Sequence, residues 1–285
     1  MKKIVLITGC SSGFGRLLVT SFLEKGWSVI ATMRNVPARE KIFNSEKQKF
    51  GDTLQILNFD VTSDADLKSI VQYLTQNGGL DCLINNAGYG VFSALEDASE
   101  KQISDQIDIN VTGLILTTRA LLPFLRHSKG HVINFSSVLG FSTLPLTSLY
   151  CGTKYAVEGF SESLYFELLP HKVRLSIVEP GAFATEFKDN VIYGELSESK
   201  DSPYFWQSEN YKNYTKDFLK NQGDPRVVVS AVMKAVDAAN PPLRIRCGKD
   251  ARMVYLAKSL VPAPFFRLLS RFFFEKTINR VRSQK

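Results

Sequence analysis

Tyr150 and Lys154 are the two side chains whose types and spacing best suit acid–base chemistry. They lie four residues apart at the start of a predicted helix, so they share one helical face. A nearby ammonium favours the phenolate, and we therefore predict a tyrosine pKa below the ordinary value of ~10. Such a tyrosine can give and take a proton near neutral pH. Ser137, at the end of a predicted strand thirteen residues before Tyr150, adds a hydroxyl that can stabilise negative charge developing on a carbonyl oxygen.

A glycine-rich turn near the start of the chain is the second group with a defined chemistry. It lies between the first predicted strand and the first predicted helix, with the spacing G-x-x-x-G-x-G. Glycines let the backbone approach a pyrophosphate closely, and the helix N-terminus offers free N–H groups and partial positive charge. We therefore predict a dinucleotide phosphate site. Its residues are Gly9, Ser11, Ser12, Gly13, Phe14 and Gly15.

The end of the second predicted strand carries the signal for the type of dinucleotide. An acidic residue there would hold the ribose 2′-hydroxyl of NAD, whereas an arginine accommodates the 2′-phosphate of NADP. Residues 31–35 contain no Asp or Glu, and Arg34 is the charged residue among them. With Ser11 as a further hydroxyl donor, this pattern predicts NADP(H) as the cofactor.

Strands and helices alternate along the chain in a way that would position these residues. Near-continuous apolar runs predict buried parallel strands, and amphipathic segments between them predict helices. The predicted strands are 5–8, 28–33, 54–59, 82–85, 131–136, 174–178 and 243–247, and the predicted helices are 15–25, 64–76, 104–125, 149–169 and 226–238. We predict an α/β fold: a single Rossmann-like, doubly wound parallel β-sheet with helices on both faces, plus a C-terminal helical tail. Ligands should then bind at the carboxyl ends of the strands.

Over residues 3 to about 245 the chain resembles the short-chain dehydrogenase/reductase family. Within it, the chain is most similar to the branch near 17β-hydroxysteroid dehydrogenase type 1 and the retinol-dehydrogenase-like reductases. The motifs that carry the resemblance follow the family's order and spacing. They are Thr8–Gly15, Asp60-Val61, Asn85–Gly88, Asn110, Ser137, Tyr150, Lys154 and Glu179–Thr185.

The resemblance implies a role for each matching position. Asp60 would hold the adenine amino group with Val61 beside it, and Asn86, Ala87 and Gly88 would line the cofactor ribose. Asn110 would hold a water that links Lys154 to solvent, and Lys154 would also bind the nicotinamide ribose. Pro180, Gly181 and Thr185 would seat the carboxamide. Phe183 departs from the family pattern, which usually has a smaller aliphatic residue there, so the local packing at the nicotinamide is in question.

The function implied is hydride transfer between NADP(H) and a carbonyl or secondary alcohol. Asn110, Ser137, Tyr150 and Lys154 would be catalytic. One alternative is a catalytically silent NADP(H)-binding regulatory protein of the same fold, which would not need all four residues. Another is a nucleotide-sugar epimerase, which also uses Y-x-x-x-K but usually has a G-x-x-G-x-x-G loop.

The segment after the sixth predicted strand, about 183–222, is expected to close over the substrate as a lid. Nine of the 36 residues in 183–218 are aromatic, whereas aromatic residues make up 11% of the whole chain. This enrichment favours a small apolar carbonyl or alcohol substrate of steroid, retinoid or lipid-like character. A lid whose aromatic residues pack on the protein's own body is an equal alternative.

The net charge of +7 is concentrated at the C-terminal end. Residues 1–240 carry 24 basic and 26 acidic side chains, whereas residues 241–285 carry 11 basic and 2 acidic ones. We therefore separate a catalytic domain, 1–248, from a basic, Phe-rich helical extension, 249–285. In the extension, Phe265, Leu268, Leu269, Phe272 and Phe273 fall on one helical face, opposite Arg267 and Arg271, although Lys276 returns to the apolar face.

Three partners suit that apolar face: a membrane surface, a second subunit, or the protein's own body. No nucleic-acid-binding motif accompanies the basic residues, so we expect no nucleic-acid partner. The resemblance implies a homo-oligomer, a dimer or tetramer, formed through the two long helices 104–125 and 149–169.

The remaining sequence signals favour a cytoplasmic protein, with peripheral membrane association as an option. Ile4–Ile7 is too short for the apolar core of a signal peptide, which needs roughly 7–15 residues, and predicts a buried strand instead. The four cysteines lie far apart and predict free thiols in a reducing compartment. The three histidines have no partner at metal-binding spacing, so no metal site is expected.

Overall fold

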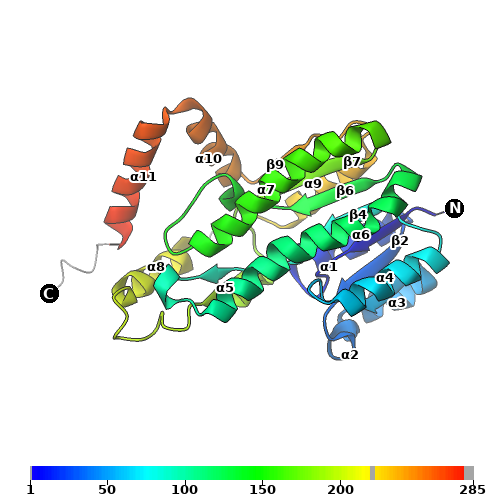
Figure 1. Ribbon diagram of the computed structural model, residues 1–285, viewed down its shortest axis with the longest axis horizontal. Helices are drawn as coiled ribbons and strands as arrows, with labels where there is room; N and C mark the ends of the chain where they lie inside the picture. The colour runs from blue at the N-terminus through cyan, green and yellow to red at the C-terminus, as the bar shows by residue number, and fades with distance from the viewer. Residues whose placement is uncertain (1, 219–221, 279–285) are drawn as a thin grey trace.

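A parallel β-sheet organises the computed structural model, which describes residues 2–218 and 222–278 (Figure 1). Its seven strands run in the order β3-β2-β1-β4-β6-β7-β9. Every strand pair in this sheet is parallel. The strands are β1 (Ile4–Ile7), β2 (Ser28–Met33), β3 (Leu54–Asn58), β4 (Cys82–Asn85), β6 (His131–Phe135), β7 (Arg174–Pro180) and β9 (Arg244–Cys247). The predicted doubly wound α/β fold is confirmed.

The order of the strands reverses beside β1, and this reversal creates the place for a ligand. From β1 the chain proceeds outward to β2 and β3, then returns to β4 on the other side of β1. The connections on the two sides therefore diverge at the carboxyl ends of β1 and β4, which is where the ligand-binding crevice lies in folds of this type. The predicted strands lie within one or two residues of the observed ones. The central strands β4, β6 and β7 are buried on both faces, whereas β9 alternates half-buried Arg244 and Arg246 with buried Ile245 and Cys247.

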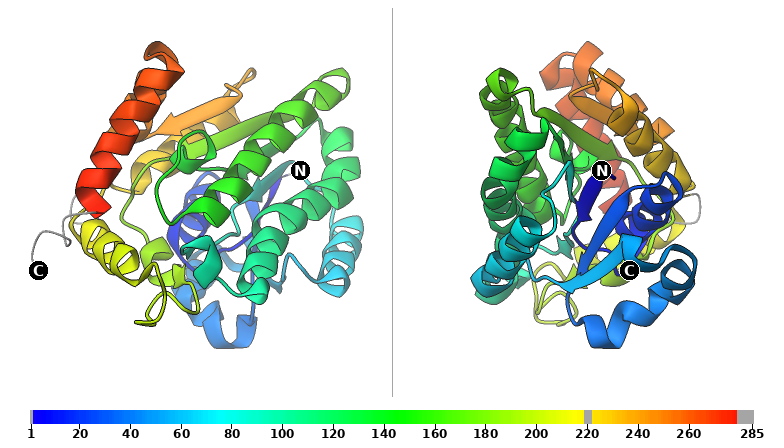
Figure 2. Two further views of the ribbon diagram at one scale, coloured as in Figure 1. Left: turned by 60° about the vertical axis from the view of Figure 1, so that its left-hand side comes forward. Right: turned by 90° about the vertical axis from the view of Figure 1, so that its right-hand side faces the viewer.

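Two layers of helices cover the sheet (Figure 2). One apolar core joins the sheet to α1 (Gly13–Glu24) and α9 (Arg226–Asp237), with Phe22 and Val232 fully buried in it. The other joins it to α4 (Asp64–Gln76), α6 (Gly113–Ser128) and α7 (Ser148–Leu168). Short helical segments follow β2, including α2 (Val36–Arg39) and α3 (Asn44–Phe50), which the sequence analysis did not predict.

The predicted helix 104–125 is wrong at its start and in its regularity. The helix begins with α5 (Glu100–Ile107), because Ser99 and Gln102 form a reciprocal capping box at its N-terminus. A π-helical turn, Asp108–Thr112, then leads into α6. The combined segment Glu100–Ser128 is long and apolar enough to cross a membrane by length and composition. Leu114, Leu121 and Leu125 on it are buried, so one face of this segment packs against the body.

Two regions beyond the main sheet frame the crevice. The predicted lid contains β8 (Ile192–Tyr193) and α8 (Phe205–Phe218), and β8 pairs with β5 (Val91–Phe92) in a small second sheet. After β9 come α10 (Lys249–Leu260) and α11 (Ala263–Ile278), and α11 lies away from the sheet and contacts α8. The parts of the predicted lid at 219–221 and of the predicted tail beyond 278 lie outside the described residues.

Candidate active site

Ser137, Tyr150 and Lys154 meet at the carboxyl end of the sheet. Ser137 lies just beyond β6, and its hydroxyl accepts a hydrogen bond from the Leu139 N–H at 3.1 Å. Tyr150 and Lys154 share one face of α7, with the Lys154 Nζ 5.7 Å from the centre of the Tyr150 ring. The Ser137 hydroxyl lies near enough to the Tyr150 side chain to affect the Tyr150 pKa. A hydroxyl, a phenol and an amine therefore face one another.

Aromatic side chains cover Tyr150, which is 6% exposed. Its ring packs against Phe92, with ring centres 5.8 Å apart, and against Phe187 from the lid, at 5.7 Å. Burial raises the pKa of Tyr150, and the Ser137 hydroxyl opposes that shift only in part. The predicted lowering of the Tyr150 pKa by Lys154 is therefore wrong. The Lys154 ammonium donates instead to the Phe135 carbonyl oxygen at 2.9 Å.

Asn110 lies in the π-helical turn between α5 and α6 and is 1% exposed. Its amide holds the loop after β4: Nδ2 donates to the Tyr89 carbonyl at 2.8 Å and Oδ1 accepts from the Tyr89 N–H at 3.1 Å. Nδ2 also donates to Thr153 Oγ1 on α7 at 3.1 Å. The Asn110 side chain is therefore engaged with the loop after β4 and with α7, and its role in holding a water for Lys154 stays a prediction.

The glycine-rich turn has the geometry of a phosphate cradle. Gly9 has φ +72°, and a Cβ there would lie 2.8 Å from the Ala87 Cα. A Cβ at Gly15 would lie 2.4 Å from the Gly9 carbonyl oxygen. Only glycine fits either position, so the turn stays tight and delivers the N-terminus of α1 to the crevice. The Ser12 and Gly13 backbone belongs to this N-terminus.

A carboxylate from the lid now bonds this helix N-terminus. The Gly13 N–H donates to Glu186 Oε2 at 2.9 Å. The position therefore accepts an anionic oxygen, as a pyrophosphate site must. A dinucleotide can use this N–H only after Glu186 moves, so the lid and the cofactor site are coupled. The residues of the turn thus fit the predicted cofactor.

Thr8 and Asn86 lock the loop after β4 against the glycine-rich turn. Thr8 Oγ1 accepts hydrogen bonds from the N–H groups of Asn86 and Ala87, both at 3.0 Å. Asn86 Nδ2 donates in return to the carbonyl oxygens of Thr8 and Gly9 at 2.9 and 3.0 Å. A Cβ at Gly88 would lie 3.7 Å from Lys154 Nζ, so this loop reaches the catalytic lysine. The structure therefore brings Asn86, Ala87 and Gly88 between the phosphate turn and the catalytic residues.

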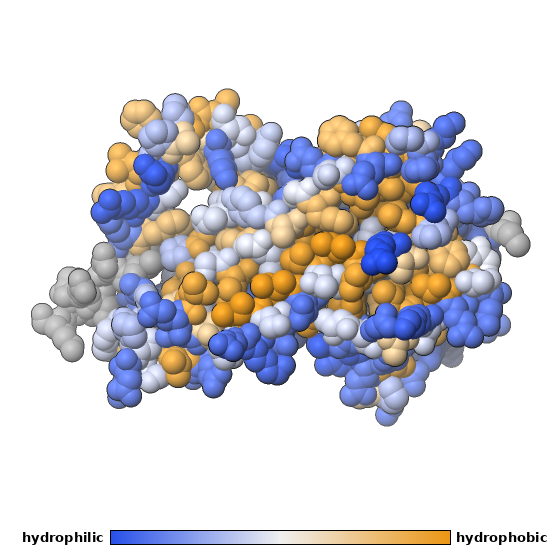
Figure 3. Space-filling model, viewed as in Figure 1, coloured by the Kyte–Doolittle hydropathy of each residue, from blue (hydrophilic) through white to orange (hydrophobic). Residues whose placement is uncertain are grey.

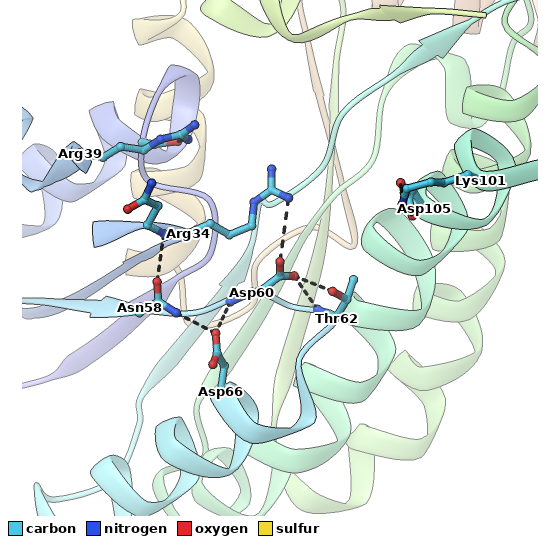
Figure 4. Close-up of polar contacts among 10 residues, drawn as sticks. Arg34, Arg39, Asn58, Asp60, Thr62, Asp66, Lys101 and Asp105 are labelled. Atoms are coloured by element: carbon cyan, nitrogen blue, oxygen red, sulfur yellow. Dashed lines mark hydrogen bonds and ion pairs between the residues drawn. The ribbon is translucent and has the colours of Figure 1, made fainter. Parts of the chain in front are cut away.

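Two arginines flank the end of β2 (Figure 4). Arg34 is exposed, with its guanidinium 3.9 Å from the Asp60 carboxylate. Arg39, from α2, donates to Ser11 Oγ at 3.3 Å. The sequence analysis missed Arg39. In the sequence, Arg39 is recognisable only as a second arginine five residues after Arg34. The structure shows that α2 turns the chain back, so that Arg39 reaches the glycine-rich loop.

Asp60 and Val61 lie at the end of β3, next to these arginines. Asp60 Oδ1 accepts from the Thr62 N–H and hydroxyl, which leaves the other carboxylate oxygen facing Arg34. Val61 is buried and packs on Gly113, where a Cβ would lie 2.7 Å from Val61 Cγ2. Both predicted residues therefore lie on the same edge of the crevice as the glycine-rich turn.

The opposite end of the crevice is formed by the segment after β7. Pro180 ends β7, and Ala182 donates its N–H to Asp250 Oδ2 at 2.7 Å, so Asp250 on α10 fixes the loop that contains Gly181. Thr185 lies beside the phosphate turn, because a Cβ at Gly13 would be 3.7 Å from Thr185 Cβ. Asp250 was not among the predicted site residues, since nothing in its spacing connects it with Gly181.

Phe183, the residue that departs from the family pattern, is buried beneath this segment. Its ring packs edge-on against Phe14, with ring centres 6.0 Å apart, and Phe14 stacks on Phe135 at 5.7 Å. Phe14 thus connects the phosphate turn to the strand that precedes Ser137. The large side chain at 183 fills the core beneath the crevice.

Comparison with known proteins agrees with this geometry. The family model described as short chain dehydrogenase matches residues 3–195. The chain belongs to this family.

Similar proteins of the short-chain dehydrogenase family cover nearly the whole chain. A 3-ketodihydrosphingosine reductase from Bacteroides thetaiotaomicron is 33% identical over 95% of this chain and 98% of its own. Retinol dehydrogenase 8 from Bos taurus is 31% identical over 92% and 86%. A solved short-chain dehydrogenase from Streptomyces avermitilis matches with a TM-score of 0.80 at 30% identity, covering 95% and 98%. The predicted resemblance, including the retinol-dehydrogenase-like relatives, is confirmed.

The protein is therefore an oxidoreductase with a nicotinamide-dinucleotide site. Other solved structures with this fold were determined with NADP or with NAD bound, so the fold alone does not distinguish the two cofactors.

A cluster of charged side chains supports this dehydrogenase site from behind. Arg244 on β9 bridges Glu158 of α7 and Glu179 of β7, both at 3.2 Å, and Arg246 pairs with Glu179 at 2.8 Å. Burial and the neighbouring Glu158 raise the pKa of Glu179 to about 7. The cluster lines a cavity of about 310 Å³ that neither Ser137 nor Tyr150 reaches. It therefore positions α7 relative to the loop of Gly181 and is separate from the substrate site.

Lys154 gives the dehydrogenase a specific pH dependence. Burial lowers the pKa of Lys154 to about 8, and the nearby Glu158 opposes the shift. We expect the ammonium to be the active form, because with the cofactor bound it would donate to a ribose hydroxyl and stabilise the phenolate that Tyr150 becomes on proton transfer. We expect kcat/KM for carbonyl reduction to be highest below pH 8 and to fall about tenfold per pH unit above it. Arginine stays protonated at these pH values. In the activity that Lys154→Arg retains, the fall in kcat/KM should therefore begin at a higher pH. A kcat/KM that rises through pH 8 to 9 would contradict this assignment.

The hydrogen bonds to Thr8 lead to a second prediction, which concerns the free energy of unfolding. Thr8→Val removes the acceptor for two N–H groups without changing the side-chain volume. We expect it to lower the free energy of unfolding by about 1–3 kcal/mol in urea denaturation and to weaken NADPH binding. Thr75→Val, at an exposed helix position, is the control and should change stability by less than about 0.5 kcal/mol. Equal effects of the two substitutions would show that Thr8 does not hold the loop.

Proposed function

We propose that the protein is an NADP(H)-dependent oxidoreductase that transfers a hydride between the nicotinamide and an apolar carbonyl or secondary alcohol. Its substrate would be steroid-, retinoid- or lipid-like. The observation that carries the proposal is the meeting of Ser137, Tyr150 and Lys154 under aromatic side chains, beside a phosphate-binding turn. Residues 1–248 would form the catalytic domain and 249–285 an extension.

The side chains divide the chemistry among themselves. NADPH, when bound, supplies the hydride to the carbonyl carbon. Ser137 holds the carbonyl oxygen, and Tyr150 protonates it as negative charge develops there. Lys154 binds the nicotinamide ribose and favours the phenolate that Tyr150 becomes. Asn110 holds the turn through which protons return to Lys154. In the reverse direction Tyr150 accepts the alcohol proton.

The preference for NADP(H) is supported by the two arginines at the end of β2. Arg34 and Arg39, with the Ser11 hydroxyl, can donate to the three oxygens of a 2′-phosphate. Asp60, the carboxylate beside Arg34, would hold the adenine amino group. The other predicted cofactor contacts, from Gly9 to Thr185, would complete the cofactor site.

An apolar substrate is supported by the cover over Tyr150. Phe92 and Phe187 pack directly on its ring, and Tyr211 of α8 packs on Phe92 with ring centres 6.2 Å apart. Tyr211 is 4% exposed. A substrate must displace this cover to reach Ser137, and a bulky apolar compound replaces the lost aromatic contacts.

We also propose a cytoplasmic homo-oligomer, a dimer or tetramer. Four buried free thiols suit a reducing compartment. An apolar band crosses α5, α6 and α7 on one face of the molecule (Figure 3). Ile107, Leu116 and Phe166 are 39–63% exposed on these helices, which makes this face suitable for a subunit interface.

The test is cofactor oxidation across a panel of apolar ketones, aldehydes and quinones, with NADPH and NADH compared. The proposal expects turnover of at least one bulky apolar carbonyl and a higher kcat/KM for NADPH. Faster turnover with NADH would contradict the role of the arginines. Tight NADPH binding without turnover of any carbonyl would favour the silent regulatory protein.

A further inference from the structure

Two consecutive helices at the end of the described chain leave large apolar side chains in solvent. The residues lie at i, i+3, i+4 and i+7 spacings, so each helix gathers them on one face. Their side chains are 54–78% exposed. They are Met253, Leu256 and Leu260 on α10, and Phe265, Leu268, Leu269 and Phe272 on α11. We call these seven residues the tail surface.

The protein's own body does not cover the tail surface. The opposite side of α10 holds it to the body: Ala251 is fully buried, and Lys258 hydrogen-bonds the Phe141 carbonyl and the Tyr155 hydroxyl. The other side of α11, with Phe266 and Ser270 half-buried, is the side toward the protein, where α11 packs on α8. Packing on the body, one of the three predicted partners, is therefore excluded for Phe265, Leu268, Leu269 and Phe272.

The surroundings of the tail surface are strongly basic. Within α10 and α11 themselves the sequence has six basic residues and two acidic ones. Both acidic groups are engaged locally: Asp250 accepts from the Ala182 N–H at 2.7 Å, and Glu275 pairs with Arg271 at 2.6 Å. Arg252 and Arg267 are exposed on the same two helices. Blue groups among the orange ones over α10 and α11 show this mixture (Figure 3).

The positive charge around the tail surface favours a membrane over a second subunit as its partner. A symmetric dimer formed through this surface would place two basic segments against each other, and like charges at an interface oppose association. A bilayer that contains anionic lipids attracts the same segment, because each lysine or arginine near its surface gains favourable electrostatic energy. Exposed Leu, Met and Phe side chains between basic ones can enter the interfacial region of such a bilayer.

A chain of contacts connects the tail surface to the catalytic residues. The helix α11 packs on α8, whose Tyr211 packs on Phe92, and Phe92 packs on the ring of Tyr150. The lid helix thus lies between the tail surface and the site. A membrane in contact with α11 would lie next to the element that an apolar substrate must displace.

We propose that α10 and α11 bind the surface of an anionic membrane, with the seven residues of the tail surface in the interfacial region. The membrane contact itself depends only on the tail surface. The delivery of substrate from the bilayer past α8 rests, in addition, on the proposed apolar substrate.

Vesicle flotation of the full chain tests the contact. The vesicles contain phosphatidylcholine alone or phosphatidylcholine mixed with phosphatidylglycerol. The test variant is Leu268→Ser/Leu269→Ser, at side chains 62% and 61% exposed. The matched control is Leu95→Ser/Leu169→Ser, the same chemical change at side chains 59% and 50% exposed away from the tail. Retained NADPH binding shows that each variant is folded.

The wild type and the control should float with the anionic vesicles and only weakly with the neutral ones. The test variant should lose at least about tenfold in partition, and Arg267→Gln should lose roughly fivefold. No flotation of the wild type, or equal loss in the control, would overturn the proposal. The proposal would also be overturned if light scattering showed a dimer for the wild type and a monomer for the test variant, while the wild type did not bind the vesicles. NADPH-dependent reduction of a water-soluble ketone in the same samples reports separately on the proposed function.

Discussion

Replacing Tyr150 by phenylalanine should lower kcat for carbonyl reduction by roughly 10³-fold, because the variant cannot protonate the carbonyl oxygen. The ring keeps its contacts with Phe92 and Phe187, so the fold and the lid should stay as they are. The dissociation constant for NADPH, measured by fluorescence titration, should change little. Steady-state kinetics with a saturating ketone would measure the loss.

Tyr155→Phe is the matched control for this prediction. Tyr155 lies on the same helix but is 40% exposed, and its hydroxyl contacts Lys258 on α10. Its loss should leave kcat within about twofold of the wild type, as is usual for an exposed position. Near-wild-type turnover of Tyr150→Phe would remove the proton donor from the mechanism.

Removing both arginines at the end of β2 should produce the second large effect. Arg34→Ala/Arg39→Ala should raise the KM for NADPH about 10²-fold, since each charge-assisted hydrogen bond contributes roughly 1.5–3 kcal/mol. The KM for NADH, which has no 2′-phosphate, should change by less than about threefold. The ratio of the two kcat/KM values measures the cofactor preference directly.

An exposed lysine in the same region separates this local effect from net charge. Lys41→Ala removes a basic side chain from the segment after α2 but leaves Arg34 and Arg39 in place. It should leave the NADPH preference unchanged. Equal losses for NADPH and NADH in the double arginine variant would indicate that the arginines support the fold and do not bind the 2′-phosphate.

The parts of the site nearest the strands were the parts that the sequence could predict. A parallel strand buried on both faces is a continuous apolar run, and the residue after it must lie at the carboxyl edge of the sheet. Ser137, Asp60 and the loop of Asn86 are fixed in this way, as is the glycine-rich turn by its close approach to Ala87. These positions follow from local pattern plus one topological rule.

What could not be predicted depends on contacts between segments far apart in the chain. Arg39 reaches Ser11 only because α2 turns back toward the glycine-rich loop. Asp250 reaches the N–H of Ala182 across 68 residues, and Glu186 reaches that of Gly13 across 173. No periodicity or spacing encodes such pairs. The pKa of Tyr150 is a further case, since its direction is set by burial under Phe92 and Phe187, which a helical spacing does not report.

The partner of the apolar face of α11 could not be predicted from the sequence either. The helical spacing of Phe265, Leu268, Leu269 and Phe272 predicted an apolar face, and α11 has one. The sequence left open what covers that face, because amphipathicity is the same for a core helix and a membrane-surface helix. Its exposure, and the contact of α11 with the lid helix α8, required the structure.

The transfer of the hydride itself is the central claim, and isotope transfer measures it most directly. The protein is incubated with NADPH deuterated at C4 of the nicotinamide and with a bulky apolar ketone, and the alcohol is analysed by mass spectrometry. We predict one deuterium at the carbinol carbon, formed faster with NADPH than with NADH and roughly 10³-fold more slowly in Tyr150→Phe. Bound cofactor with no deuterium in any carbonyl product would contradict the account and indicate a cofactor-binding protein without catalysis.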